Sequence, residues 1–250
     1  MKLISVLAVV MGELGMGTIL FVCMQRTGEI RASFFNFQSY LAAAAFLLMS
    51  IASSGSHFYM SYYFPSAVFA VLAAGHFSAE RWKWGKALLA LAGVLAAIFL
   101  AGQIWMSEPR TGSRVLALAN VAAGALLFGW SNGAMILGHW YLIMRGLSFS
   151  HFQRATSQLL AMVALRALVL GAACLWIMGG HANGGKLPPP TSDGLFFGMR
   201  ILWGLLLPGV FGFMAWRCAR TGSNQAGTGL LYITEVAVLI GEILAGFLGL

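Results

Sequence analysis

Charged residues are scarce in this chain of 250 residues: they make up 9% of it, and only seven are acidic. Hydrophobic residues account for 60%, and the mean hydropathy is +0.83. Because a soluble domain carries about 25% charged residues, this composition argues against a water-soluble globular protein. It indicates a polytopic membrane protein instead.

Metal and phosphate motifs are also missing. The sequence contains neither the zinc motif H-E-x-x-H nor the phosphate loop G-x-x-x-x-G-K-S/T. Its three cysteines, Cys23, Cys174 and Cys218, are far apart and form no C-x-x-C pair. We therefore expect the cysteines to pack against neighbouring helices rather than to bind a metal.

Long apolar runs fill almost the whole chain. A helix needs about 20 apolar residues to cross about 30 Å of hydrocarbon. Eight stretches meet this requirement, at 3–24, 37–55, 59–78, 87–106, 115–143, 156–179, 195–217 and 227–249. The sequence therefore predicts an all-α bundle of about eight transmembrane helices, forming a single domain over residues 1–250.

The basic residues gather in alternate loops. The odd-numbered predicted loops hold nine cations: Arg26, Arg31, Arg81, Lys83, Lys86, Arg145, Arg154, Arg217 and Arg220. The other side holds four: Lys2, Arg110, Arg114 and Lys186. The positive-inside rule then places both termini on the non-cytoplasmic side, in a multi-pass protein of the bacterial inner membrane. The net charge of +8 is read as a topology signal and not as a nucleic-acid surface.

Four ionisable residues fall well inside the predicted spans: Glu13, Arg166, Glu235 and Glu242. Such residues are costly in hydrocarbon, usually face the interior of a bundle and are candidates for function. Arg166 is predicted to be the only cation near mid-membrane, with Arg200 closer to a helix end. Because one arginine neutralises one carboxylate well, at least one carboxyl group is left for proton relay or ion coupling.

The two glutamates of the last span share one face. Seven residues turn a helix by about 700°, so Glu235 and Glu242 lie within about 20° of each other and about 10 Å apart along the axis. We expect both side chains to point inward.

A second group of candidates lies near the predicted cytoplasmic ends of two spans. His76 and His139 each follow a glycine at similar depth, as two axial ligands of a b-type haem would. The segment GHWYLIMR adds Trp140, Tyr141 and Arg145, which suit a quinone ring and its carbonyl groups. Interfacial histidines bound to backbone or lipid headgroups are the alternative interpretation.

The ending LYITEVAVLIGEILAGFL, with L-I-G-E-x-L from Leu239 to Leu244, resembles the last helix of the membrane-anchor subunits of DMSO-reductase and polysulfide-reductase complexes. The resemblance covers one helix and the helix count. It implies an eight-helix, quinone-interacting subunit that passes electrons to or from a peripheral partner.

Three functions follow from these features. The first is a subunit of an electron-transfer complex, which interacts with quinone or haem b, relays protons and associates with other subunits. It is a quinone-interacting or non-catalytic subunit more than an enzyme by itself. The second is a small-solute or ion transporter in which Glu13, Arg166, Glu235 and Glu242 form the coupling site. The third is a structural or assembly subunit without a cofactor.

Overall fold

The computed structural model describes residues 2–26, 30–52, 57–107, 111–144, 148–181 and 192–248. Nearly all of them are helical, and none of these ranges contains a β-strand. The elements are α1 (Lys2–Met24), α2 (Ala32–Ala52), α3 (His57–Ser78), α4 (Trp82–Ser107), α5 (Thr111–Ile143), α6 (Phe149–Trp176), α7 (Ser192–Ile201), α8 (Leu207–Thr221) and α9 (Asn224–Leu248). Two π-helical turns, η1 (Ile177–His181) and η3 (Leu202–Leu206), continue α6 and join α7 to α8.

The all-α prediction is confirmed. Because α7, η3 and α8 form one continuous rod, each of the eight apolar stretches corresponds to one rod of helix. Seven of the rods are long and apolar enough to cross a membrane. The remaining one, α3, contributes a shorter apolar stretch, Tyr63–Ser78. The helices thus have the composition of a multi-pass membrane protein.

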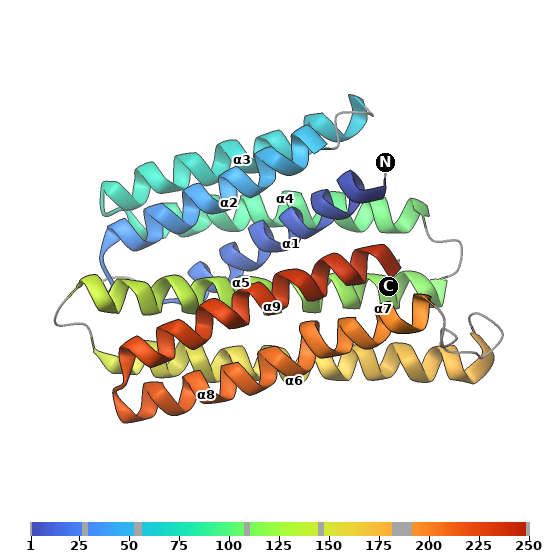
Figure 1. The fold of residues 1–250 in the computed structure, drawn as a ribbon. Coiled ribbons are helices and arrows are strands. Elements are labelled where there is room, and N and C mark those ends of the chain that lie inside the picture. Colours follow the sequence, from blue (N-terminus) through green and yellow to red (C-terminus); the bar gives the residue numbers. More distant parts are fainter. Residues whose placement is uncertain are drawn as a thin grey trace.

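The helices pack as two rings of four. In the first ring α1 and α3 each contact both α2 and α4. In the second ring α5 and α8 each contact both α6 and α9. The rings meet where α1 packs against α5 and α9, so these three helices form the centre of the molecule (Figure 1). The last residues of α1, α3, α5 and α8 all lie at one end of the bundle, and α9 ends at the other (Figure 1).

The junction between the rings is held together by backbone contact between α1 and α5. A Cβ added to Gly17 would lie 1.8 Å from the carbonyl oxygen of Ala125, and one added to Gly129 would lie 1.9 Å from the carbonyl carbon of Gly17. Phe21 of α1 packs edge-on against Trp130 of α5, with ring centroids 5.7 Å apart. Only glycine permits this approach, which brings Glu13 of α1 close to α5 and α9.

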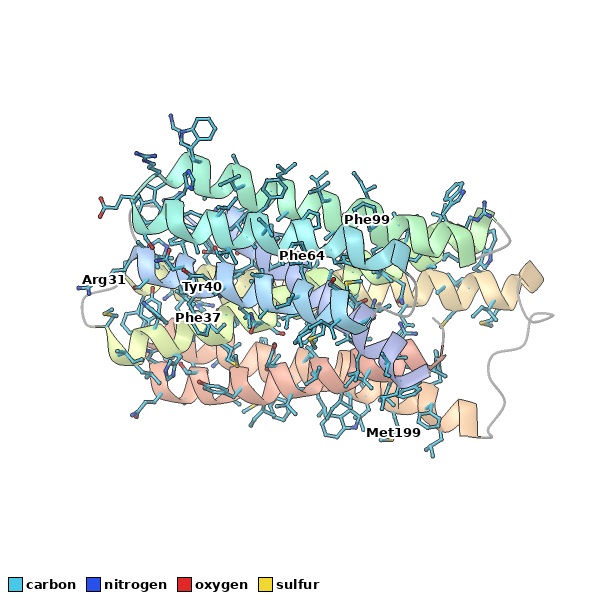
Figure 2. The ribbon with its side chains drawn as sticks, turned by 90° about the horizontal axis from the view of Figure 1, so that it is seen from above. Arg31, Phe37, Tyr40, Phe64, Phe99 and Met199 are labelled. Atoms are coloured by element: carbon cyan, nitrogen blue, oxygen red, sulfur yellow. The ribbon has the colours of Figure 1, made fainter. Side chains whose placement is uncertain are left out.

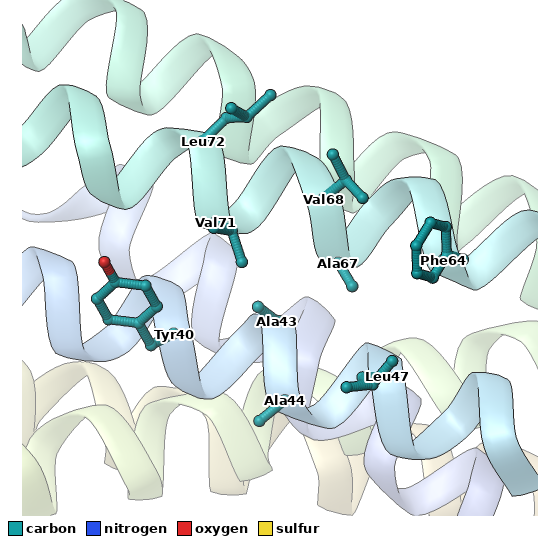
Figure 3. Close-up of a pocket in the computed structure, with 9 residues that line it drawn as sticks. All are labelled: Tyr40, Ala43, Ala44, Leu47, Phe64, Ala67, Val68, Val71 and Leu72. Carbon is teal, nitrogen blue, oxygen red and sulfur yellow. The ribbon is translucent and has the colours of Figure 1, made fainter.

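Apolar side chains cover the outside of the bundle (Figure 2). A shallow groove of about 410 Å³ runs between α2 and α3 on this surface, with Tyr40 and Phe64 among its lining residues (Figure 3). These two side chains are 53% and 55% exposed. Such a surface suits contact with lipid chains, and it lies apart from the polar interior described next.

Candidate functional site

A salt bridge lies inside the second ring. Arg166, on α6, donates from Nη2 to Oε2 of Glu242, on α9, over 2.6 Å. Arg166 is 4% exposed and Glu242 is 2% exposed. The predicted neutralisation of one buried glutamate by Arg166 is therefore confirmed, with Glu242 as the partner.

A second arginine joins this site, although the sequence placed Arg200 closer to a helix end than Arg166 and not beside it. Arg200 of α7 is 3% exposed, and its Nη2 donates to Oδ1 of Asn120 on α5 over 2.8 Å. The same Asn120 oxygen accepts from Nη1 of Arg166 over 2.9 Å, and the Asn120 backbone carbonyl accepts from that nitrogen as well. Asn120 thus holds the two guanidinium groups beside each other, although both are positively charged.

Glu13 approaches Glu242 across Gly124 of α5. A Cβ on Gly124 would lie 2.9 Å from Oε1 of Glu13 and 2.9 Å from Oε2 of Glu242. The two carboxyl groups are therefore near neighbours, and glycine leaves the room that they occupy. We call Glu13, Asn120, Arg166, Arg200 and Glu242 the charge cluster. Its two glutamates and two arginines balance each other, as burial of charge requires.

The π-helical turn η3 explains how α7 reaches the cluster. Pro208, at the start of α8, lacks an N–H group and would clash with the carbonyl of Gly204 in a regular α-helix. In the wide turn the N–H of Leu207 donates instead to the carbonyl of Leu202, five residues back. Gly204 then lies against Gly241 of α9, where a Cβ on Gly241 would be 2.3 Å from the Gly204 Cα. This close contact places Arg200 beside the Glu242 segment.

Glu235 lies outside the charge cluster, so the expected single site containing all three glutamates is not what the fold forms. Its Oε2 is hydrogen-bonded to the Ser131 hydroxyl of α5. Throughout the described residues, no lysine, arginine or histidine forms an ion pair with it. The prediction that Glu235 and Glu242 share an inward face is confirmed, since both point to α5.

Small residues of α5 face polar residues of α9 in a regular register. Gly124 faces Glu242, Ser131 faces Glu235, and Gly138 faces Thr228, whose Oγ1 would be 2.7 Å from a Cβ on that glycine. Both series are spaced by seven residues, so antiparallel helices present them as three successive pairs about 10 Å apart. We call these three pairs the polar ladder. Sequence reasoning found its α9 side through the glutamates but missed its α5 side.

The two histidines belong to helices whose main packing neighbours differ. His76 lies on α3, which packs on α2 and α4, and its Nδ1 is 3.0 Å from the carbonyl oxygen of Leu72. His139 lies on α5, which packs on α1, α6 and α9, and its Nδ1 is 3.3 Å from the Tyr232 hydroxyl. No group of three or more His, Cys, Asp or Glu that could hold a metal occurs among the residues placed by the structure.

The aromatic residues after His139 pack within the protein. The Trp140 ring lies 6.0 Å from Phe34 of α2, and its buried Nε1 has no hydrogen-bond partner in the described ranges. The Tyr141 ring stacks on Phe149 at 5.8 Å, and its hydroxyl donates to the Ser148 carbonyl. Arg145 lies outside the described residues. Trp140 and Tyr141 thus point to different helices.

Ser131 sits in the segment GWSNG, which has the G-x-S-x-G spacing of a nucleophile elbow. That motif functions as a sharp turn between a strand and a helix, where the serine is exposed. Here the segment is a continuous part of α5, and Ser131 is fully buried. Its environment supports hydrogen bonding within the bundle and not nucleophilic catalysis.

Comparisons of the chain with protein-family models, curated proteins and solved structures give no match. The charge cluster and the polar ladder are therefore the features of this chain that bear on its function.

Proposed function

We propose that this chain is an integral membrane protein that transfers protons along the interface of α5 and α9, with Glu235 as the carboxyl group that takes up and releases the proton. The supporting observation is the contrast between balanced and unbalanced charge. The charge cluster contains two arginines and two glutamates, whereas Glu235 has one hydroxyl partner and, within the described segments, no cation in an ion pair with it. Glu235 is half-buried beside α5, and a carboxyl group in apolar surroundings without a cation is most stable in its neutral form.

The surroundings of Ser131 support the same assignment. Its Oγ lies 3.0 Å from the carbonyl oxygen of Phe128 and also within hydrogen-bonding distance of Glu235 Oε2. A serine hydroxyl has one proton to donate and can also accept. Both contacts are full hydrogen bonds only if Ser131 donates to Phe128 and a protonated Glu235 donates to Ser131.

The experiment is a proton-flux assay. The purified full chain is reconstituted in liposomes that hold a pH-sensitive dye, and a potassium diffusion potential drives protons across the membrane. Glu235→Gln keeps the shape of the side chain but cannot exchange a proton, so we expect the flux to fall by about tenfold or more. Glu80→Gln, at an exposed glutamate between α3 and α4, is the matched control and should keep the wild-type flux. Wild-type flux equal to that of empty liposomes, or full flux in Glu235→Gln, would contradict the proposal.

The process coupled to this proton movement is proposed to be electron transfer, as the resemblance of the last helix implies. In this proposal the chain is a subunit in the bacterial inner membrane, surrounded by lipid and associated with other subunits, with both termini on the non-cytoplasmic side. Quinone is favoured over haem b as the cofactor, because His76 lies on α3, which packs mainly on α2 and α4, and His139 lies on α5, which packs mainly on α1, α6 and α9.

Cofactor content tests this part. Protein purified with its partners is expected to yield quinone on extraction. The proposed quinone site lies near the segment that contains His139 and Trp140. If haem b is bound instead, a Soret band is present, and both His76→Ala and His139→Ala are expected to remove it. Protein with neither quinone nor a Soret band, but with Glu235-dependent flux, would favour the alternative of a proton-coupled solute transporter.

A further inference from the structure

The pairs of the polar ladder are separated by dry layers. Between the Ser131–Glu235 pair and the charge cluster, the register of α5 and α9 places Phe128 opposite Val238, which are 2% and 0% exposed. Between the Ser131–Glu235 pair and the Gly138–Thr228 pair it places Ala134 beside Leu231, both fully buried. We call these the Phe128–Val238 layer and the Ala134–Leu231 layer.

Packed layers of this kind block proton movement. A proton crosses about 10 Å only along water or side chains that exchange hydrogen bonds, and interiors packed at crystal density leave no room for water. Glu235 is itself half-buried, and along the α5–α9 interface one such layer separates it from the charge cluster and the other separates it from Thr228.

The third pair of the polar ladder, Gly138 and Thr228, lies where a path for protons from Glu235 would continue. Thr228 is 1% exposed, and its Oγ1 has no hydrogen-bond partner in the part of the chain that the structure describes. A buried hydroxyl without a partner is costly, so this atom is a ready site for a water molecule. The exposed His139 follows Gly138, and its Nδ1 lies 3.3 Å from the hydroxyl of Tyr232, which stands on α9 between Thr228 and Glu235.

We propose that Glu235 is an occluded proton-exchange site closed by two apolar gates, the Phe128–Val238 layer and the Ala134–Leu231 layer. Separation of α5 from α9 at one layer connects Glu235 with the charge cluster, and separation at the other connects it with Thr228, Tyr232 and His139. This inference rests on the proposed role of Glu235 and adds the two gates that control access to it.

The test measures how fast the carboxyl group of Glu235 exchanges with solvent. Infrared spectroscopy follows the carbonyl band of the protonated side chain after transfer from H₂O to D₂O, with Glu235→Gln to identify the band. Leu231→Ala and Val238→Ala each remove packing atoms from one gate and lower the cost of opening it. We expect each to accelerate the exchange by about tenfold or more over wild type.

The controls are truncations on the lipid-facing side of the same helix. Ile233 and Val236 are 48% and 54% exposed, and Ile233→Ala and Val236→Ala should leave the exchange rate unchanged. Leu231→Val is a milder truncation and replaces Leu231→Ala in the test if that variant does not fold. The Glu235 carboxyl group should exchange faster in Leu231→Val than in Ile233→Ala. Exchange of the Glu235 proton in the wild type that is as fast as the change of solvent would contradict the proposed gates. Equal exchange rates in the gate variants and the control variants would contradict them as well. Absence of the band would overturn the occluded neutral site.

The proton-flux assay and the infrared exchange measurement test different statements, so one can fail while the other succeeds. Flux that depends on Glu235, together with exchange that is unaffected by Leu231→Ala and Val238→Ala, would leave the proposed function standing without gates. Exchange controlled by the two layers, together with absent flux, would identify an occluded carboxyl group that does not carry protons across the membrane.

Discussion

Replacing Arg166 by methionine is expected to destabilise the protein by about 3–5 kcal/mol, because it leaves Glu242 buried beside Glu13 with one of the two cations gone. Arg166 donates to Glu242 over 2.6 Å and to Asn120 over 2.9 Å, so its removal also takes one hydrogen bond from each of these two buried side chains. The free energy of unfolding is measured by titration of detergent micelles with a denaturing detergent.

Charge balance predicts how this loss is reversed. The double variant Arg166→Met with Glu242→Gln restores equal numbers of buried cations and anions, and it should recover most of the lost stability. Arg154→Met, at an exposed position of the same helix, is the matched control and should be nearly neutral. A double variant as unstable as Arg166→Met alone would show that the cluster is not held together by charge balance.

Gly129→Ala is expected to cost about 3 kcal/mol or more, because the new methyl group would meet the backbone of Gly17, which cannot move without separating the two rings. Gly133→Ala tests the reason: its Cβ would meet the Phe21 ring at 2.3 Å, and a side chain can rotate away more readily than a backbone can shift. The expected loss for Gly133→Ala is therefore smaller.

The control for both is Gly102→Ala on α4, where an added Cβ meets nothing within 4 Å. This variant should be as stable as the wild type or more so, since alanine favours helix. Equal stability of Gly129→Ala and Gly102→Ala would contradict the backbone contact between α1 and α5.

The helices themselves could be predicted from the sequence because hydrophobic length is a local property. The eight apolar stretches each became one rod, and the seven-residue spacing of Glu235 and Glu242 correctly put both on one face. The lateral order of the helices could not be predicted in this way. Hydropathy gives each span a length and two ends, but it does not say which spans are neighbours, so the two rings of four emerge only from the structure.

The errors about the site have the same origin. Arg200 looked like a residue near a helix end, yet the turn η3 and the contact of Gly204 with Gly241 place it inside the bundle. Asn120 carries no charge and was overlooked, although its amide oxygen joins both arginines. The series Gly124, Ser131 and Gly138 was a usable signal, because its spacing matches that of Thr228, Glu235 and Glu242 in the opposite direction.

The separation of Glu235 from the cluster changes which glutamate matters for function. From the sequence, any of the three could be the carboxyl group left over after Arg166 had neutralised one. The structure pairs Glu242 with Arg166, places Glu13 and Arg200 in the same charge cluster, and leaves Glu235 bonded to Ser131. The coupling role proposed for the whole set is therefore concentrated on one residue.

The most direct test of this account is the infrared spectrum of the purified full chain near neutral pH. We predict a carbonyl band of a protonated carboxyl group that disappears in Glu235→Gln and persists in Glu242→Gln, because Glu242 is paired with Arg166 whereas Glu235 has no ion pair among the residues that the structure describes. A wild-type spectrum without such a band, or a band that Glu235→Gln leaves unchanged, would contradict the account.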